Sequence, residues 1–103
     1  MRADAIETKL LSRGEEGREA MEALLRHEAP LVRNTAAWAV AEWAPELAVP
    51  VIEDLLRWAY VQRDSKGRVF LEPAILIGDA QEFLSRHYGI KPREVVPRVL
   101  GIA

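Results

Sequence analysis

The chain has 103 residues and no cysteine, so we predict a single domain, residues 1–103, without disulfides, thiolate metal sites or cysteine nucleophiles. Hydrophobic residues make up 50% of the chain and charged residues 29%, a balance typical of globular proteins that excludes a disordered chain. Fourteen basic against sixteen acidic residues leave a formal charge of -2, which excludes a strong overall attraction to nucleic acid or to anionic lipid.

The chain shows no sign of targeting to a membrane. Its first seven residues carry no apolar signal core, and its longest apolar run, residues 36–41, is far shorter than the roughly 20 residues that span a bilayer. We therefore predict a soluble, cytoplasmic protein.

Apolar residues at helical spacing predict six helices. The first, residues 4–11, should be a short helix or a cap, because Gly14 and Gly17 weaken its continuation by about 1 kcal/mol each relative to alanine. The second, residues 15–27, begins with acidic residues and ends with basic ones, as the helix dipole favours. Its apolar stripe should contain Ala20, Met21, Leu24 and Leu25.

The third predicted helix begins at Pro30, because proline can occupy the first helical position without losing a needed donor. Its apolar face should contain Val32, Ala36, Ala39, Val40 and Trp43, and its small residues should let a neighbouring helix approach closely. The helix should end near Pro45, where the fourth helix begins with Pro50 in its early part. That helix should bury Ala48, Ile52, Leu55, Leu56 and Ala59 and reach about Gln62.

Residues 64–67, Asp-Ser-Lys-Gly, predict a turn, because Asp and Ser compete for backbone hydrogen bonds and Gly adopts left-handed dihedrals. The apolar residues 69–71 are compatible with a loop, a strand or a helix start. The fifth helix, residues 73–88, should end at a glycine, and residues 92–100 form the sixth. The apolar side of the fifth helix should contain Leu76, Ala80, Phe83, Leu84 and His87.

Two internal matches indicate repetition. Residues 21–27, MEALLRH, match residues 52–58, IEDLLRW, at a spacing of 31 residues, and residues 45–52 match residues 92–99 at a spacing of 47. Both spacings fit an array of helical hairpins, and their difference places an insertion between residues 57 and 74. This insertion is either a longer helix with a structural loop or a binding loop.

A leucine-rich helix is followed by a brief link to Pro30, then by Val32-Arg33 and Ala36-Ala37, and then by a helix that contains Pro50. In this order of features, residues 15–56 resemble a HEAT repeat of the short bacterial, phycobilisome-lyase-like kind. The resemblance implies an all-α fold, a short right-handed α-solenoid of stacked antiparallel helix hairpins with about two and a half HEAT-like units. It also implies that the exposed surface binds other macromolecules.

The second unit departs from this pattern, since Gly78-Asp79-Ala80-Gln81 replaces the Val-Arg and Ala-Ala pairs. In the family, the position of Arg33 usually contacts acidic groups of neighbouring helices. The resemblance therefore implies an intramolecular ion pair for Arg33, and the alternative is a contact with a phosphate or a partner.

Two tryptophans lie off the predicted apolar faces. At about 100° per residue, Trp38 falls beside Asn34 and Glu42, and Trp58 falls off the apolar line of the fourth helix. Each either packs between successive hairpins or anchors an interface, where aromatic residues often dominate the binding energy. The exposed ends of a short repeat stack also favour self-association.

The inserted segment mixes basic and aromatic groups. Arg63, Lys66 and Arg68 occur there with Tyr60 and Phe70, which would suit an acidic protein or a nucleic acid, and the alternative is a solvated loop. Because only three positive charges are present, we do not expect nucleic acid to be the main partner.

The sequence shows no catalytic pattern. His27 and His87 lie on different predicted helices without carboxylates at metal-ligand spacing, and there is no Ser-His-Asp order, glycine-rich phosphate loop or HExxH helix. The acidic pairs Glu15-Glu16 and Glu53-Asp54 fit solvated helix faces. We therefore expect no enzyme activity, no cofactor and no metal.

These observations predict a non-catalytic protein-interaction module or adaptor with an unidentified protein partner, and homo-oligomers are a further option. One alternative is a small bacterial immunity or antitoxin-type protein that occludes a partner enzyme, and another is a weak nucleic-acid binder that uses the inserted basic loop. The candidate partner-binding residues are Arg33, Trp38, Trp58, Arg63, Lys66 and Arg68.

Overall fold

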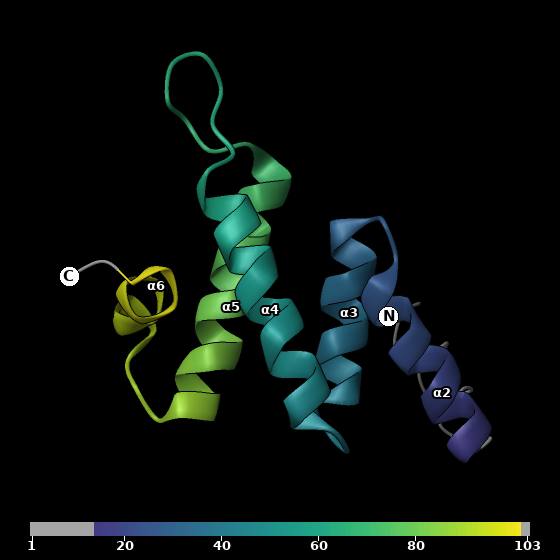
Figure 1. The fold of residues 1–103 in the computed structure, drawn as a ribbon. Helices are drawn as coiled ribbons and strands as arrows, with labels where there is room; N and C mark the ends of the chain where they lie inside the picture. Colours follow the sequence, from purple (N-terminus) through teal and green to yellow (C-terminus); the bar gives the residue numbers. More distant parts are fainter. Residues whose placement is uncertain (1–13, 102–103) are drawn as a thin grey trace. The chain divides into compact units, whose positions relative to one another are not determined.

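The structure, a computed structural model, describes residues 14–101, and all regular secondary structure in this part is helical (Figure 1). The prediction of an all-α protein is confirmed for these residues, whereas the predicted helix 4–11 lies outside them. The elements are α2 (Glu15–Ala23), the 3-10 turn η1 (Leu24–Arg26), α3 (Pro30–Val40), α4 (Pro45–Tyr60), α5 (Leu71–Tyr88) and α6 (Pro92–Leu100).

Four helix boundaries differ from the prediction, and one of them is the end of α4, at Tyr60 instead of about Gln62. The second predicted helix changes from α to 3-10 geometry after Ala23, and the His27 amide closes that turn on the Leu24 carbonyl. α3 ends at Val40 and not near Pro45, because the Glu42 and Trp43 amides donate to the carbonyls three residues back, Ala39 and Val40, so the chain continues in turns. α5 begins at Leu71, two residues before the predicted start at Pro73. Pro73 is tolerated in the first turn, because the backbone amides of that turn have no partner within the helix.

By residue contacts the chain divides into two compact units, Met1–Val51 and Ile52–Ala103, and the boundary falls within α4. In the first unit, α2 and η1 both pack on α3. The small residues predicted for the α3 seam are buried, with Ala36 and Ala37 at 0% exposure. Among residues 14–51, the buried hydrophobic residues are Met21, Ala36, Ala37, Ala39, Val40, Ala44, Ala48 and Val49.

The side of α3 opposite this seam is also covered. Asn34 is buried at 7% exposure, and Trp38 is half-buried with its indole nitrogen shielded from solvent. On α2, Ala20 is exposed although it was assigned to the apolar stripe, whereas Met21 is buried as predicted. Hydrophobic spacing therefore placed Met21 and the α3 seam correctly, misassigned Ala20 and gave no sign that Asn34 would be buried.

In the second unit, α5 packs against α6. The hydroxyl of Tyr88 donates a hydrogen bond to Glu53, and the Arg98 guanidinium lies 4.2 Å from the centre of the Tyr88 ring, so these side chains connect α4, α5 and α6. Gly89 ends α5 in the left-handed conformation, as predicted. Within residues 52–101, the buried hydrophobic residues are Ile52, Leu55, Leu56, Ala59, Leu76, Ala80, Phe83, Leu84, Val95 and Val99.

His87 was assigned to the apolar face of the fifth helix, and this assignment is wrong. The side chain is exposed and lies edge-on to the neighbouring Tyr88 ring. In the last turn of α5, Tyr88 makes the contact with α4, so His87 turns toward solvent about 100° away around the helix.

Candidate functional site

Exposed large hydrophobic side chains are concentrated in one stretch of the second unit. Of the eight such side chains among residues 14–101, six lie between Trp58 and Ile75. They come from the end of α4, from the loop 61–70 and from the start of α5, and Figure 1 shows that loop projecting beyond the ends of the two helices. We call this set the loop surface; it consists of Trp58, Val61, Val69, Phe70, Leu71 and Ile75.

The loop 61–70 is ordered by one side chain, Asp64. Its Oδ1 accepts hydrogen bonds from the backbone amides of Lys66 at 2.8 Å and Arg68 at 2.9 Å, and its Oδ2 accepts one from Arg68 Nε at 3.0 Å. The Gly67 amide donates to the Asp64 carbonyl, and Gly67 has a φ of 81°, which favours glycine. The turn predicted at residues 64–67 is confirmed.

The base of the loop is closed by backbone pairing. The Asp64 amide donates to the Arg68 carbonyl at 2.8 Å, and an isolated antiparallel β-bridge joins Arg63 and Val69. Val69, whose conformation the sequence left open, therefore belongs to the loop stem, and the next helix begins at Leu71.

The pKa of Asp64 lies below its ordinary value of 3.8, chiefly because the Arg68 amide donates to the carboxylate. Partial desolvation acts in the opposite direction, and the Lys66 amide and the Arg68 side chain lower the pKa further. The carboxylate is therefore charged, and it keeps its acceptor role, throughout the physiological pH range.

The charges of the loop are predominantly positive. Arg63, Lys66 and Arg68 are exposed, and Asp64 is the only acidic residue between positions 61 and 70, so this segment carries a formal charge of +2. The Arg63 guanidinium lies 5.4 Å from the centre of the Tyr60 ring, within the range of a cation–π contact. Arg68 is held by its ion pair with Asp64.

Four of the six partner-binding candidates lie together in this part of the second unit. Trp58 belongs to the loop surface, and Arg63, Lys66 and Arg68 lie on the loop beside it. The sequence interpretation missed the aliphatic members, Val61, Val69, Leu71 and Ile75. A signal was present for the last two, because Leu71 and Ile75 are four residues apart and share one side of α5 away from its buried face.

The other two candidates, Arg33 and Trp38, are on α3 in the first unit. Arg33 Nη1 donates to the carbonyls of His27 at 2.7 Å and Glu28 at 3.0 Å. Its intramolecular contact is therefore with backbone carbonyls at the end of η1, where helical hydrogen bonding has stopped, and not with the acidic side chains that the resemblance implied.

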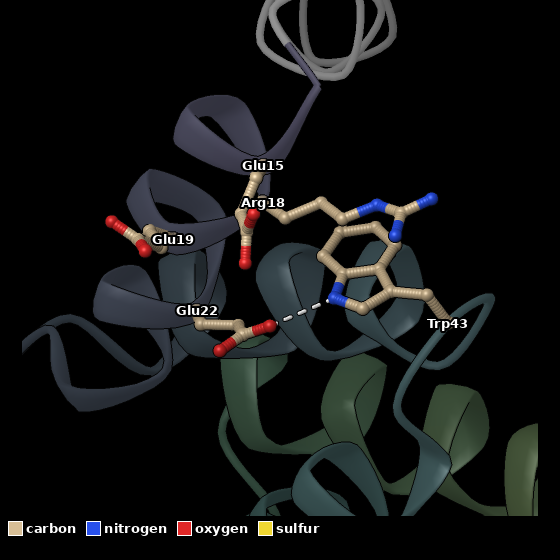
Figure 2. A pocket seen from close by; sticks show the side chains of 5 residues that line it. All are labelled: Glu15, Arg18, Glu19, Glu22 and Trp43. Carbon is tan, nitrogen blue, oxygen red and sulfur yellow. Dashed lines mark hydrogen bonds between the residues drawn. The ribbon is translucent and has the colours of Figure 1, made fainter.

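An open pocket of about 440 Å³ lies on the first unit between α2 and the turn that follows α3 (Figure 2). Trp43 Nε1 donates to Glu22 Oε2 at 2.8 Å, and the Arg18 guanidinium lies 5.6 Å from the centre of the Trp43 ring. Figure 2 shows Arg18 extended across the indole and Glu19 pointing away from it. The sequence placed Trp43 on an apolar face, but its nitrogen requires a polar partner, which α2 supplies.

The acidic pair on α4, Glu53 and Asp54, makes side-chain bonds that were not expected of a solvated helix face. Glu53 is half-buried and accepts the Tyr88 hydroxyl, while Asp54 is exposed and pairs with Arg57 at 2.8 Å. The bond to Glu53 is also the main reason why the pKa of Tyr88 is raised above 10.0, with burial and the charge of Glu53 acting in the same direction.

Within residues 14–101, no group of three or more His, Cys, Asp or Glu side chains is placed to hold a metal ion. No helix in this described part is long and apolar enough to cross a membrane.

Comparison of the chain with family models, with curated proteins and with solved structures finds no match. The HEAT-repeat resemblance therefore stays an interpretation of the sequence.

Proposed function

We propose that this protein is a non-catalytic protein-interaction module that binds a partner protein through the loop surface. The observation that carries the proposal is the concentration of exposed large hydrophobic side chains between Trp58 and Ile75. Scattered exposed hydrophobics are normal on a protein surface, but a contiguous group with a polar rim is typical of a binding site. Arg63 and Lys66 supply such a rim.

The internal order of the loop also supports the proposal. Association is weakened when a segment must lose conformational freedom in order to bind. Because Asp64 already ties the loop through its bonds to Lys66 and Arg68, the loop presents Phe70 with little further ordering. Aromatic anchors in such positions commonly contribute most of the binding energy, and Trp58 and Phe70 are the candidates here.

The HEAT-like arrangement of stacked hairpins is part of the same proposal. Its support is the repetition of one pattern, in which α4 and α6 both begin with a proline and carry a second one five residues later, at Pro50 and Pro97. In repeat proteins, an insertion such as the loop 61–70 is often located on the binding face.

Affinity capture from the source organism with two matched double variants tests the proposed site. Phe70→Ser with Leu71→Ser removes two exposed members of the loop surface. The control, Leu31→Ser with Leu47→Ser, removes two similarly exposed leucines, at 44% and 43% exposure, that lie elsewhere. All four side chains are exposed, so far-UV circular dichroism and the Tm should change little in either variant.

We expect one specific partner to be lost with the loop-surface variant and kept with the control. With that partner purified, Trp58→Ala should weaken binding at least about tenfold in calorimetry, as expected for an aromatic anchor. A captured set that is the same for the loop-surface variant and for wild type would contradict the proposal.

A further inference from the structure

We propose that the loop surface docks on the acidic side of α2 in a second copy of this chain, so that copies associate head to tail. This inference rests on the proposed function, because it takes the loop surface to be the docking surface and names its partner.

The charge of the loop limits what the loop surface can bind. Arg63 and Lys66 are exposed beside the apolar side chains, and the segment 61–70 carries +2. Two loop surfaces brought face to face would place these like charges opposite one another, which opposes a symmetric contact. The partner surface should therefore be acidic and should offer apolar or aromatic area.

The same chain carries a surface of this kind in its other unit. α2 and η1, residues 15–26, contain four glutamates and two arginines and carry a formal charge of -2. Glu15, Glu16 and Glu19 are exposed, and Glu15 and Glu22 line the open pocket whose wall is the Trp43 indole (Figure 2). We call the four glutamates of α2, together with Trp43, the acidic face.

The acidic face already contains an arginine–indole contact beside carboxylates, which is the kind of contact that docking requires. Within one copy, the Arg18 guanidinium lies 5.6 Å from the centre of the Trp43 ring, beside carboxylates. An arginine that arrives from a second copy would find the same combination of an aromatic ring and negative charge. Arg63 is suited to this role, because it is exposed and its guanidinium already makes a contact of this kind, 5.4 Å from the centre of the Tyr60 ring.

A single contact between two different surfaces leaves one of each unused in a pair. Such contacts either pair reciprocally in a two-fold dimer, close into a ring or continue into longer chains. Because the contact is partly electrostatic and lies at the surface, added salt should weaken it.

The test is sedimentation velocity of the full chain over a range of concentrations. For wild type, the weight-average mass should rise above the 11.6 kDa of one copy as concentration increases, and it should fall again at high salt. Reversing the loop charges, Arg63→Glu with Lys66→Glu, should weaken association about tenfold or more, and so should reversing the acidic face, Glu15→Lys with Glu19→Lys. These four positions are exposed, and the bonded residues Arg68 and Glu22 are left in place.

Combining both reversals in one chain should restore association, because the loop is then acidic and α2 is basic. As controls, Arg93→Glu and Glu46→Lys change exposed charges on α6 and α4 and should leave association unchanged. A wild-type chain that stays at the mass of one copy would overturn the inference, and so would association that survives either reversal. A monomeric chain that still loses a captured partner in Phe70→Ser with Leu71→Ser would refute only self-association and leave the proposed function standing.

Discussion

At the scale of single residues, one carboxylate decides the conformation of the inserted loop. Asp64 accepts from two backbone amides and one guanidinium, and these three bonds join Lys66 and Arg68 to the start of the turn. Asp at the first position of a turn is a strong local signal, which is why the turn was predictable. The bond from the Arg68 side chain to Asp64 was not predictable, since the same arginine could equally have faced solvent.

Removing this carboxylate should loosen the loop without unfolding the protein. In Asp64→Ala, we expect faster hydrogen exchange of the Lys66 and Arg68 amides, because both lose their acceptor. Ser65→Ala, one position along the loop, serves as the control. Unchanged exchange at both amides would show that Asp64 does not order the loop.

The same carboxylate predicts a pH dependence. The folded pKa of Asp64 is lowered below 3.8, so its contribution to loop order is present above the unfolded pKa and is lost as the pH falls through the folded value. NMR shifts of the Lys66 and Arg68 amides should therefore stay constant from about pH 5 to 8 and titrate with a midpoint below 3.8. A midpoint above 3.8 would contradict the bonding described here.

At the scale of elements, α3 depends on its alanines. Ala36 and Ala37 are fully buried and Ala39 nearly so, in a helix on which both α2 and η1 pack. Small side chains let helix backbones approach closely, and a tightly packed interior has little space for added atoms. The sequence predicted the seam, since Pro30 and the alanine spacing are local features.

A larger side chain in this seam should destabilise the protein. Ala36→Leu should lower the free energy of unfolding by about 1–3 kcal/mol through overpacking, as measured by chemical denaturation. Thr35→Leu places the same side chain at an exposed position of the same helix and should have a much smaller effect. Equal effects of the two substitutions would show that the seam tolerates the added volume.

At the scale of the whole molecule, α4 belongs to both compact units. Its N-terminal part supplies Ala48 and Val49 to the buried residues of the first unit, and its remainder supplies Ile52 and Leu56 to those of the second. Helix formation is cooperative along the chain. We therefore expect a destabilising substitution in one unit to lower the stability of the other unit as well.

Leu56→Ala tests this coupling, because the side chain is fully buried in the second unit. The free energy of unfolding should fall by about 2–5 kcal/mol, and hydrogen exchange should accelerate in α3 as well as in α5. Leu47→Ala, at an exposed position of the same helix, is the control. Faster exchange confined to residues after 52 would show that the two units open independently.

The sequence by itself determined where the helices form, because their signals are local. Prolines at first helical positions, Gly89 after α5 and the Asp64 turn each act within a few residues. Which side chains stay exposed was decided only by the tertiary structure, because exposure depends on which neighbouring element covers each side of a helix. For this reason Asn34 is buried, the Trp43 indole donates to Glu22, and Leu71 and Ile75 remain exposed.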